Sequence, residues 1–202
     1  MTGLRVAFCS LEAAKYACLN WHYARRLPTH KKIAIGVWED GEFKGVIMFG
    51  HGATPHLGDA YGLKMQEVAE LTRVALRGHA YPVSQMLARA IALFSKHSPG
   101  TRLIVSFADP GQNHHGGIYQ ATNWLYVGRS TAVRQYYFRG SWRNDRNVME
   151  YLKKHPEVRQ QLPTRKVEGK HKYLMPLDKK MRRAVKHLAQ PYPKPDRGQA
   201  SQ

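Results

Sequence analysis

The stretch "IAIGVWEDGEFKGVIMFG", residues 33–50, constrains the fold of this chain more than any other. Two runs rich in β-branched and aromatic residues flank Asp40-Gly41, a dipeptide that suits the tight turn of a two-stranded hairpin. The extended run "EVAELTRVAL" (67–76) follows, and "PVSQMLARAIALFSKH" (82–97) then places apolar residues at helical spacing. The sequence therefore predicts a hairpin and a long strand that precede a central amphipathic helix.

Shorter segments surround this unit and complete an α/β (α+β) pattern, in which strands and helices form one mixed sheet with flanking helices. A chain of 202 residues, 43% of them hydrophobic, can bury one sizeable core. We expect a single domain over residues 1–189 and a disordered, Pro-rich tail at 190–202. The further expected elements are strands at 4–9, 102–109, 124–127 and 170–177, and helices at 11–20 (with Ser10 as N-cap), 118–120, 147–155 and 178–189.

This order of elements is similar to that of the GNAT acyltransferase superfold. In that fold two parallel strands splay apart after the central helix, and an acyl donor lies in the gap. Topology alone indicates where a site lies and leaves the reaction open. In this chain we expect the site between the strand of Ser106 and the strand of Tyr126, with a basic C-terminal extension beyond it.

Positive charge is the strongest global signal. Lysine and arginine number 32 against 14 acidic residues, for a net charge of +18. Residues 1–128 hold 13 basic and 8 acidic residues, whereas residues 129–202 hold 19 and 6. We favour a nucleic acid over a membrane surface as the polyanionic partner, because aromatic residues interleave the basic ones in "RQYYFRGSWRNDR" (134–146).

Several function classes are disfavoured. The apolar runs are too short to span a bilayer, and the N-terminus lacks the features of a signal peptide. Cys9 and Cys18 fit neither a disulfide framework nor a zinc motif. We therefore expect a protein of the cytoplasm that does not act in a membrane.

Six segments in the same order resemble the Mom family of bacteriophage DNA-modification proteins, over about Trp21 to Leu188. The family's activity, as the resemblance implies it, converts adenine in DNA to a carbamoylmethyl derivative on its exocyclic amine and shields phage DNA from host restriction enzymes. The setting is then the cytoplasm of the host bacterium. The segments are "WHYARRLP", "GVWEDGEFKGVIMFG", "ELTRVALRGHAYPVSQMLARAI", "LIVSFADP", "HHGGIYQATNW" and "KHKYLMPLDKKMRR".

Two other readings of the function stay open. One is a non-catalytic nucleic-acid-binding protein on a decayed acyltransferase fold. The other is an acyltransferase that acts on the amines of RNA or protein. One departure bears on the cofactor: "RGHAYPVSQ" (77–85) replaces the acetyltransferase signature Arg/Gln-x-x-Gly-x-Gly/Ala, so a standard pyrophosphate cradle for coenzyme A is in doubt.

The stretch after the strand of Ser106 supplies the main catalytic candidates. Asp109 could hold or deprotonate the adenine amine, and the resemblance places an essential acid here; the alternative is a turn cap. Tyr119 could act as a general acid or stack on a base, and the alternative is a packing aromatic. Asn123 could pair with adenine, and a helix C-cap is the alternative.

Gly116 and Gly117 are expected to let a donor approach the N-terminus of the helix that holds Tyr119. Arg73 could bind a donor phosphate or carboxylate, and an ion pair with Glu67 or Glu70 is the alternative. Strict alternation would place Leu71 and Arg73 on one face of their strand. Ser84, in the first turn of the central helix, could bind an anionic or carbonyl oxygen, or could extend the helix cap.

A His-Tyr pair ends the first helix, and in the Mom family this pair lies near the active site. Tyr23 is therefore a catalytic candidate, and His22 is a DNA-binding candidate beside Arg25 and Arg26. The family has been associated with iron, which makes His22 a conceivable ligand, although the sequence shows no facial set of two histidines and a carboxylate. The other expected DNA contacts are His114, His115, Arg143, Lys179, Arg182 and Arg183.

The chemistry of the implied product limits the donor. The product has an N–CH₂ bond, whereas acyl transfer forms an N–CO bond. An activated glycine, such as glycyl-tRNA, would acylate the amine, and the glycine amine would then attack ring carbon six through a five-membered arrangement. Acetyl-CoA with radical chemistry at iron is the alternative. The expected partners are duplex DNA with a flipped adenine and, for the first donor, a tRNA.

Overall fold

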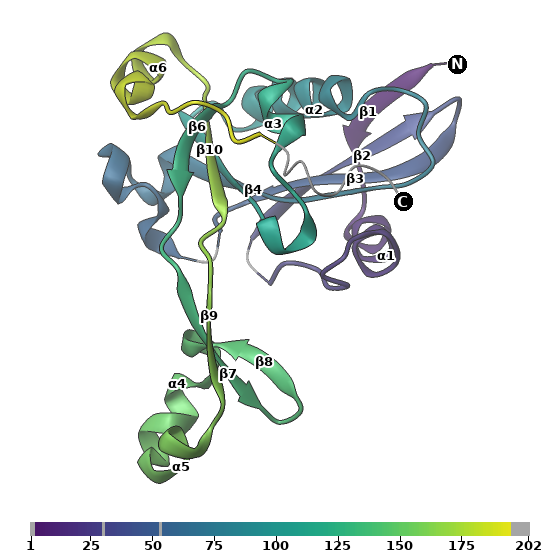
Figure 1. Cartoon of the computed structure of the whole chain (residues 1–202). Helices are drawn as coiled ribbons and strands as arrows, with labels where there is room; N and C mark the ends of the chain where they lie inside the picture. The colour runs from purple at the N-terminus through teal and green to yellow at the C-terminus, as the bar shows by residue number, and fades with distance from the viewer. Residues whose placement is uncertain (1–2, 30, 53, 195–202) are drawn as a thin grey trace.

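The computed structural model describes residues 3–29, 31–52 and 54–194, and its described part contains two sheets (Figure 1). The larger sheet has seven strands in the order β1-β2-β3-β4-β5-β10-β6. Its strands are β1 (Leu4–Phe8), β2 (Lys32–Glu39), β3 (Glu42–Gly50), β4 (Val68–Leu76), β5 (Leu103–Ala108), β6 (Leu125–Arg129) and β10 (His171–Pro176). The helices that flank it are α1 (Leu11–Trp21), α2 (Val83–His97), α3 (Gly117–Gln120) and α6 (Lys179–Val185). This is the mixed α/β architecture that the sequence predicts.

Local sequence signals explain the N-terminal half. The Ser10 hydroxyl accepts a hydrogen bond from the Ala13 backbone N–H at 3.2 Å, so Ser10 is the N-cap of α1 as expected. Asp40 and Gly41 have φ values of +50° and +89°, which allow the tight turn between β2 and β3. The predicted apolar face of α2 packs against the sheet, with four fully covered side chains: Met86, Leu87, Ala90 and Phe94.

The parallel strands β4 and β5 separate after three residue pairs. Their register runs from Val68–Leu103 to Glu70–Val105, and β4 then continues to Leu76 along a different path from β5. A β-bulge lies just beyond this point, because Met48 pairs with Arg73 while the next residue, Phe49, pairs with Leu71. The splay that the GNAT-like topology implies is therefore present, and it lies between β4 and β5.

The bulge also changes which residues of β4 share a face. Leu71 and Val74 pack in the core beside α2, whereas Ala75 packs in the core beside α1. Arg73 is two residues before Ala75, so its side chain lies on the same face of β4 as that of Ala75, the face toward α1. The expectation that Leu71 and Arg73 share a face is wrong, because Thr72 is an extra residue in the strand.

Strand β10 occupies the position that we predicted for the site. Tyr173 of β10 pairs with Ser106 of β5 on one side and with Tyr126 of β6 on the other. The predicted gap between the strands of Ser106 and Tyr126 is therefore filled by a strand. The prediction took neighbours in the sequence as neighbours in the sheet, whereas β10 returns from much later in the chain.

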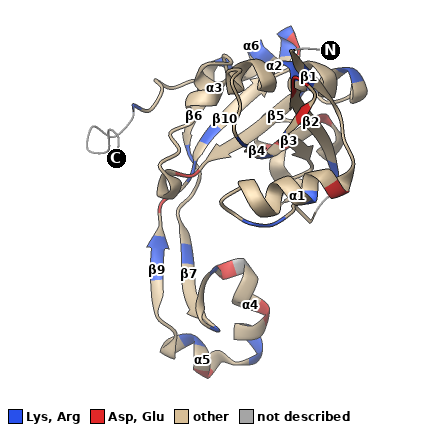
Figure 2. Cartoon of the chain, turned by 90° about the vertical axis from the view of Figure 1, so that its right-hand side faces the viewer, with Lys and Arg blue, Asp and Glu red and all other residues tan. Residues whose placement is uncertain are grey.

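A second unit, which we call the arm (residues 133–167), projects from the sheet (Figures 1 and 2). Its three-stranded sheet has the order β8-β7-β9. Its elements are β7 (Val133–Phe138), β8 (Ser141–Asn144), α4 (Asp145–Lys154), α5 (Pro156–Gln161) and β9 (Thr164–Val167). The sequence predicted α4 alone among these elements.

The arm has its own small core, built from Tyr136, Phe138, Val148 and Leu152. Tyr136 therefore packs inside the arm, while Tyr137 and Trp142 are exposed on its surface. β7 and β8 carry these three aromatic residues away from the main sheet.

The start of the predicted disordered tail is ordered. The Gln190 backbone N–H donates to the Tyr126 carbonyl oxygen at 2.8 Å, and the Tyr192 hydroxyl donates to the Trp124 carbonyl oxygen at 2.7 Å. Residues 195–202, the rest of the predicted tail, lie outside the described residues. Among the described helices, none combines the length and the apolar character needed to cross a membrane.

Candidate active site

A cavity of about 620 Å³ opens where β4 and β5 separate. Its wall comes from the end of α1, the second half of β4, the end of β5 and the loop that leads into α3. Among the lining residues are Trp21, His22, Tyr23, Arg73, His79, His114, His115, Gly116, Gly117 and Tyr119. A larger hollow of about 730 Å³ lies between β1 and α2, but aromatic and histidine side chains are absent from its described lining. We therefore place the candidate site at the splay.

Tyr119 contributes a buried polar group to the wall of the cavity. Its hydroxyl lies 2.9 Å from the Ser106 hydroxyl, which lies 3.1 Å from the Leu71 carbonyl oxygen. A carbonyl oxygen can only accept, so when both bonds exist Ser106 donates to Leu71 and Tyr119 donates to Ser106. Burial raises the pKa of Tyr119 to about 12, although the Ser106 hydrogen bond opposes this shift. Tyr119 is therefore a neutral phenol at physiological pH, as a proton donor must be.

Gly116 has a structural reason to be glycine that the sequence did not reveal. Its φ is +86°, and a Cβ at this position would lie 2.4 Å from the ring of Tyr173. The Tyr173 hydroxyl donates to the His115 carbonyl oxygen, which fixes the loop that carries both histidines. From the sequence we expect Gly116 to let a donor approach closely. A donor cannot enter from the side where a Cβ would point, because the buried ring of Tyr173 fills that space.

Aromatic rings line the mouth of the cavity. The rings of His22 and Tyr23 stack with centroids 4.3 Å apart, and Tyr23 meets His114 edge-on at 5.6 Å. The Ala24 backbone N–H donates to Nδ1 of His22 at 3.0 Å. The pKa of His22 falls to about 4, because burial and the nearby Arg73, His114 and Lys170 disfavour its charged form. His22 is therefore neutral at pH 7, with its proton on Nε2.

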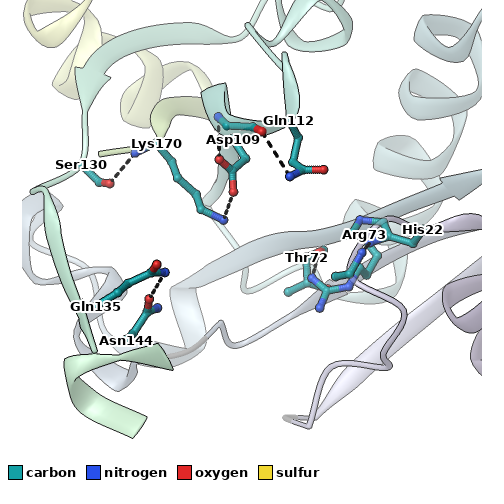
Figure 3. A network of polar contacts seen from close by, with 11 residues as sticks. His22, Thr72, Arg73, Asp109, Gln112, Ser130, Gln135, Asn144 and Lys170 are labelled. Carbon is teal, nitrogen blue, oxygen red and sulfur yellow. Dashed lines mark hydrogen bonds and ion pairs between the residues drawn. The ribbon is translucent and has the colours of Figure 1, made fainter. Parts of the chain in front are cut away.

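Arg73 lies beside His22 on the α1 side of the sheet (Figure 3). Its guanidinium donates to the carbonyl oxygen of Thr72 and, through Nε, to that of Arg26 at 3.5 Å. Glu67, one of the acids weighed as its partner, lies 3.9 Å from Arg102 instead. The side chain is thus held by backbone oxygens at the cavity wall.

Asp109 ends β5, and its carboxylate has partners within the protein. One oxygen accepts from the Gly111 backbone N–H at 3.0 Å, and the other lies 2.9 Å from Nζ of Lys170 (Figure 3). Asp109 is not one of the described residues that line the cavity. Asp109 therefore caps the turn after β5, which was the alternative to a catalytic role. It also forms an ion pair with Lys170, just before β10.

The loop before α2 holds a buried carboxylate that sequence reasoning missed. Glu39, which is 5% exposed, accepts the backbone N–H groups of Ala80 at 2.8 Å and of Tyr81 at 2.9 Å. Ser84 is half-buried in the first turn of α2, and the cavity reaches this turn at Val83. The signal for Glu39 was weak, because its partners lie 41 and 42 residues further along the chain.

Several predicted residues lie elsewhere. Asn123 is exposed in the turn after α3 with a φ of +60°; the C-cap residue of this helix is Ala121, and Asn123 closes the turn that follows it. Arg25 and Arg26 are exposed next to the cavity mouth. Three predicted DNA contacts are on α6 and one is on the arm, outside the described lining of the cavity: Lys179, Arg182, Arg183 and Arg143.

The donor set does not fit a metal ion. Within residues 3–29, 31–52 and 54–194, no three His, Cys, Asp or Glu side chains lie close enough together to hold one. Nδ1 of His22 already accepts a backbone hydrogen bond. We therefore assign no step to iron.

The order of elements, the β4 bulge and the splay define a GNAT-like fold. Solved structures agree: an aminoglycoside acetyltransferase, AAC(6')-Ib, superposes with a TM-score of 0.51 at 11% identity, over 92% of this chain and 98% of that chain, in a complex with coenzyme A and kanamycin. Its complex with coenzyme A alone gives a TM-score of 0.51 at 10% identity over the same shares. Likeness at this level establishes the fold alone.

Within this fold class, the chain belongs to the Mom protein family, whose model matches residues 3–194. It is similar to the methylcarbamoylase mom of Escherichia phage Mu, with 24% identity over 204 aligned residues. The match covers 95% of this chain and 84% of the phage Mu protein. The resemblance that the six sequence segments indicated is confirmed at the level of the family.

The described residues do not fit the pyrophosphate of coenzyme A in the way that this fold class implies. Backbone N–H groups before the helix that follows β4 would have to face the phosphates. Here the N–H groups of Ala80 and Tyr81 are bound to Glu39, and Pro82 has none to offer. A phosphate at this loop would also meet the negative charge of Glu39. We therefore derive no step through coenzyme A.

Proposed function

We propose that this protein is a DNA-modifying transferase that converts adenine in DNA to its carbamoylmethyl derivative on the exocyclic amine. The modification would protect the DNA from restriction enzymes. Membership of the Mom family and similarity to the phage Mu protein support the proposal. The cavity at the β4–β5 splay, with aromatic rings at its mouth and a neutral phenol at its base, is the observation that carries it.

The arrangement suits a base that has left the duplex. The amine of a paired adenine is inaccessible in the helical stack, so the base must be flipped out at a cost of a few kcal/mol. The stacked rings of His22 and Tyr23 offer a flat surface to such a base at the cavity mouth. Tyr23, predicted as a catalytic residue, therefore serves in this proposal as a stacking residue.

The cavity residues divide the chemistry among them. The phenol of Tyr119 donates a hydrogen bond to the oxygen or nitrogen on which negative charge develops. His114 and His115 line the same cavity, and an imidazole is a common acceptor for the proton that leaves the amine. Arg73 contributes a fixed positive charge. Asp109 positions the β5 end through Lys170 instead of acting as the base.

An activated glycine, such as glycyl-tRNA, is the donor that we propose. The adenine amine attacks the ester carbonyl, an N–CO bond forms, and the tRNA leaves with its hydroxyl. The glycine amine then attacks ring carbon six, and the bond from that carbon to the original amine breaks. The original nitrogen takes up a proton as a carboxamide, which leaves N–CH₂–CO–NH₂ on the ring without any redox step. Proximity favours the second attack, with effective molarities on the order of 10⁵ M or more.

Mass spectrometry of nucleosides from DNA of expressing cells tests the proposed reaction. We expect an adenine nucleoside heavier by one carbamoylmethyl group. Tyr119→Phe should reduce its yield by roughly 10²-fold or more, the usual contribution of a positioned proton donor. The variant should remain folded, because the ring still packs on Trp124 and Tyr173. Unmodified DNA from the wild type would contradict the enzyme and favour a non-catalytic DNA-binding protein.

An isotope label tests the rearrangement separately. Adenine carrying ¹⁵N on its exocyclic amine should give a product whose label lies in the terminal carboxamide. A label that stays bonded to the purine ring would exclude the rearrangement and favour direct alkylation, while leaving the modification itself intact.

A further inference from the structure

We propose that the open face of the arm's sheet, defined by Gln135, Tyr137, Trp142, Asn144 and Arg165, binds the unpaired bases of a single DNA strand. The inference rests on the proposed function in one respect, which is that DNA is the substrate. It adds a second contact for the DNA, separate from the cavity at the splay.

The two faces of the arm's sheet differ sharply. On one face Tyr136 and Phe138 pack against Val148 and Leu152 of α4 and form the arm's core. Side chains alternate along a strand, so Gln135 and Tyr137 of β7 point to the other face. Their register partners on β8 and β9 point the same way: Asn144, Trp142 and Arg165.

Two large rings lie together on this open face in contact with solvent. Tyr137 and Trp142 are 43% and 37% exposed, and their ring centroids are 5.4 Å apart. The guanidinium of Arg165 lies 4.4 Å from the centre of the Trp142 ring. Exposed aromatic rings with a neighbouring arginine on a sheet surface are a recurrent platform for unstacked bases.

Polar side chains hold this platform in shape. Nε of Arg165 donates to Oε1 of Gln135 at 2.9 Å, and Nε2 of Gln135 donates to Oδ1 of Asn144 at 2.8 Å. The chain of hydrogen bonds crosses all three strands and fixes the guanidinium beside the indole. A platform that is ordered in advance loses little side-chain entropy when a base stacks on it.

Charge around the platform complements a phosphate backbone. Residues 133–167 include nine Lys or Arg residues and three acidic residues. Basic positions lie along β7, β9 and α5 in Figure 2. In duplex DNA the faces of the bases are stacked on one another. A duplex could therefore bind the basic side chains through its phosphates, but its bases could not stack on the rings of Tyr137 and Trp142. The combination of both fits a strand whose bases are exposed, as they are where a duplex opens to release an adenine.

The base of the arm is joined to the candidate site. The Ser130 backbone N–H donates to the Lys170 carbonyl oxygen at 2.8 Å, and the Lys170 N–H donates to the Ser130 hydroxyl at 2.9 Å. The side chain of Lys170 then pairs with Asp109 at the end of β5 (Figure 3). The root of the arm is therefore connected to β5, the strand that ends at the cavity.

Binding of a fluorescent single-stranded oligonucleotide, and of its duplex, to the full chain tests the inference. Trp142→Ala should weaken single-strand binding by roughly fivefold to a hundredfold, the range for one lost stacked base. It should change duplex binding less than twofold. The slope of log affinity against log salt should stay the same, since no charge is removed. Trp142→Phe should retain most of the affinity.

Phe8→Ala is the matched control, because Phe8 is an aromatic residue that is 46% exposed on β1 of the main sheet. It should leave single-strand binding unchanged. Equal losses for single strand and duplex in Trp142→Ala, or no loss at all, would overturn the inference. A wild type that binds neither form of DNA would instead contradict the proposed function. Thermal unfolding of each variant separates these results from misfolding of the arm.

Discussion

At the scale of single residues, the wall of the candidate site depends on a glycine that makes room for a buried ring. Gly116 has a φ of +86°, and a Cβ there would meet Tyr173 at 2.4 Å. Gly41 has a nearly equal φ of +89°, and no described atom lies within 4 Å of its Cβ position. The two positions share the backbone strain and differ in the steric contact.

Alanine at each position separates the two effects. Gly41→Ala should lower the free energy of unfolding by about 1–2 kcal/mol, the cost of a left-handed residue. Gly116→Ala should cost about 1–3 kcal/mol more, because the Tyr173 ring must move. Chemical denaturation measures both values. Equal losses would mean that the ring shifts freely and that Gly116 is not needed for packing.

His22 links the site to pH. Its pKa is about 4 in the folded protein, chiefly because of burial, against the usual 6.5 when unfolded. The folded state thus binds a proton less readily than the unfolded state. The stability from neutral His22 is therefore complete above about pH 6.5 and is lost as the pH falls through about 4.

His22→Gln removes this titration, and glutamine can still accept the Ala24 N–H. Between pH 7 and pH 4, the wild type should lose more stability than the variant does, by an amount on the order of 1 kcal/mol. Denaturation midpoints at several pH values provide the comparison. If stability falls with pH in the same way in the wild type and the variant, His22 is not buried as the structure indicates.

At the scale of elements, the loop between β4 and α2 has two of its backbone N–H groups bound by a carboxylate of the protein itself. Glu39 accepts two backbone N–H groups there. We expect coenzyme A at millimolar concentration to leave the melting temperature of the wild type unchanged, because Glu39 already binds two N–H groups of this loop and its charge opposes a pyrophosphate there. A clear rise in melting temperature would contradict this assignment.

Glu39→Ala should destabilise the protein by about 1–3 kcal/mol, because two buried N–H groups lose their acceptor. Glu42→Ala, three residues away and exposed, is the matched control and should cost less than about 1 kcal/mol. Thermal and chemical unfolding measure both. Equal small effects would mean that water replaces the carboxylate at the loop.

The sequence predicted those elements whose signals are local. The Asp40-Gly41 turn and the apolar face of α2 depend on residues close together in the chain, and both are confirmed. The place of β10 depends on pairing with β5 and β6, which the periodicity of its own residues does not encode. The short strands of the arm escaped notice, because their open face mixes polar and aromatic side chains.

The candidate site divides in the same way. Tyr119, His114 and His115 were found because they follow a strand within one loop-helix segment, and the structure brings them to one cavity. Ser106 and Glu39 were missed, since each acts through backbone or hydroxyl partners in another element. The roles of all five residues remain predictions, of which Tyr119→Phe and Glu39→Ala test two.

At the scale of the whole molecule, positive charge covers elements that lie far from the cavity lining. Lys179, Arg182 and Arg183 belong to α6, beside the main sheet. Reversal of all three to Glu should weaken duplex binding strongly at low salt, because each phosphate contact releases about one counterion. The slope of log affinity against log salt should flatten by roughly 0.9 for each lost contact. An unchanged slope would show that α6 does not face the DNA.

The position of β10 has a consequence for how the protein is made. β10 is the last of the described strands along the chain, yet it lies inside the sheet between β5 and β6. On the ribosome, the complete arm therefore emerges before the strand that carries Tyr173 and supports the Gly116 loop. A nascent chain can complete the sheet of the arm while the candidate site still lacks the support of Tyr173. The candidate site can therefore be complete only after the arm has been synthesised.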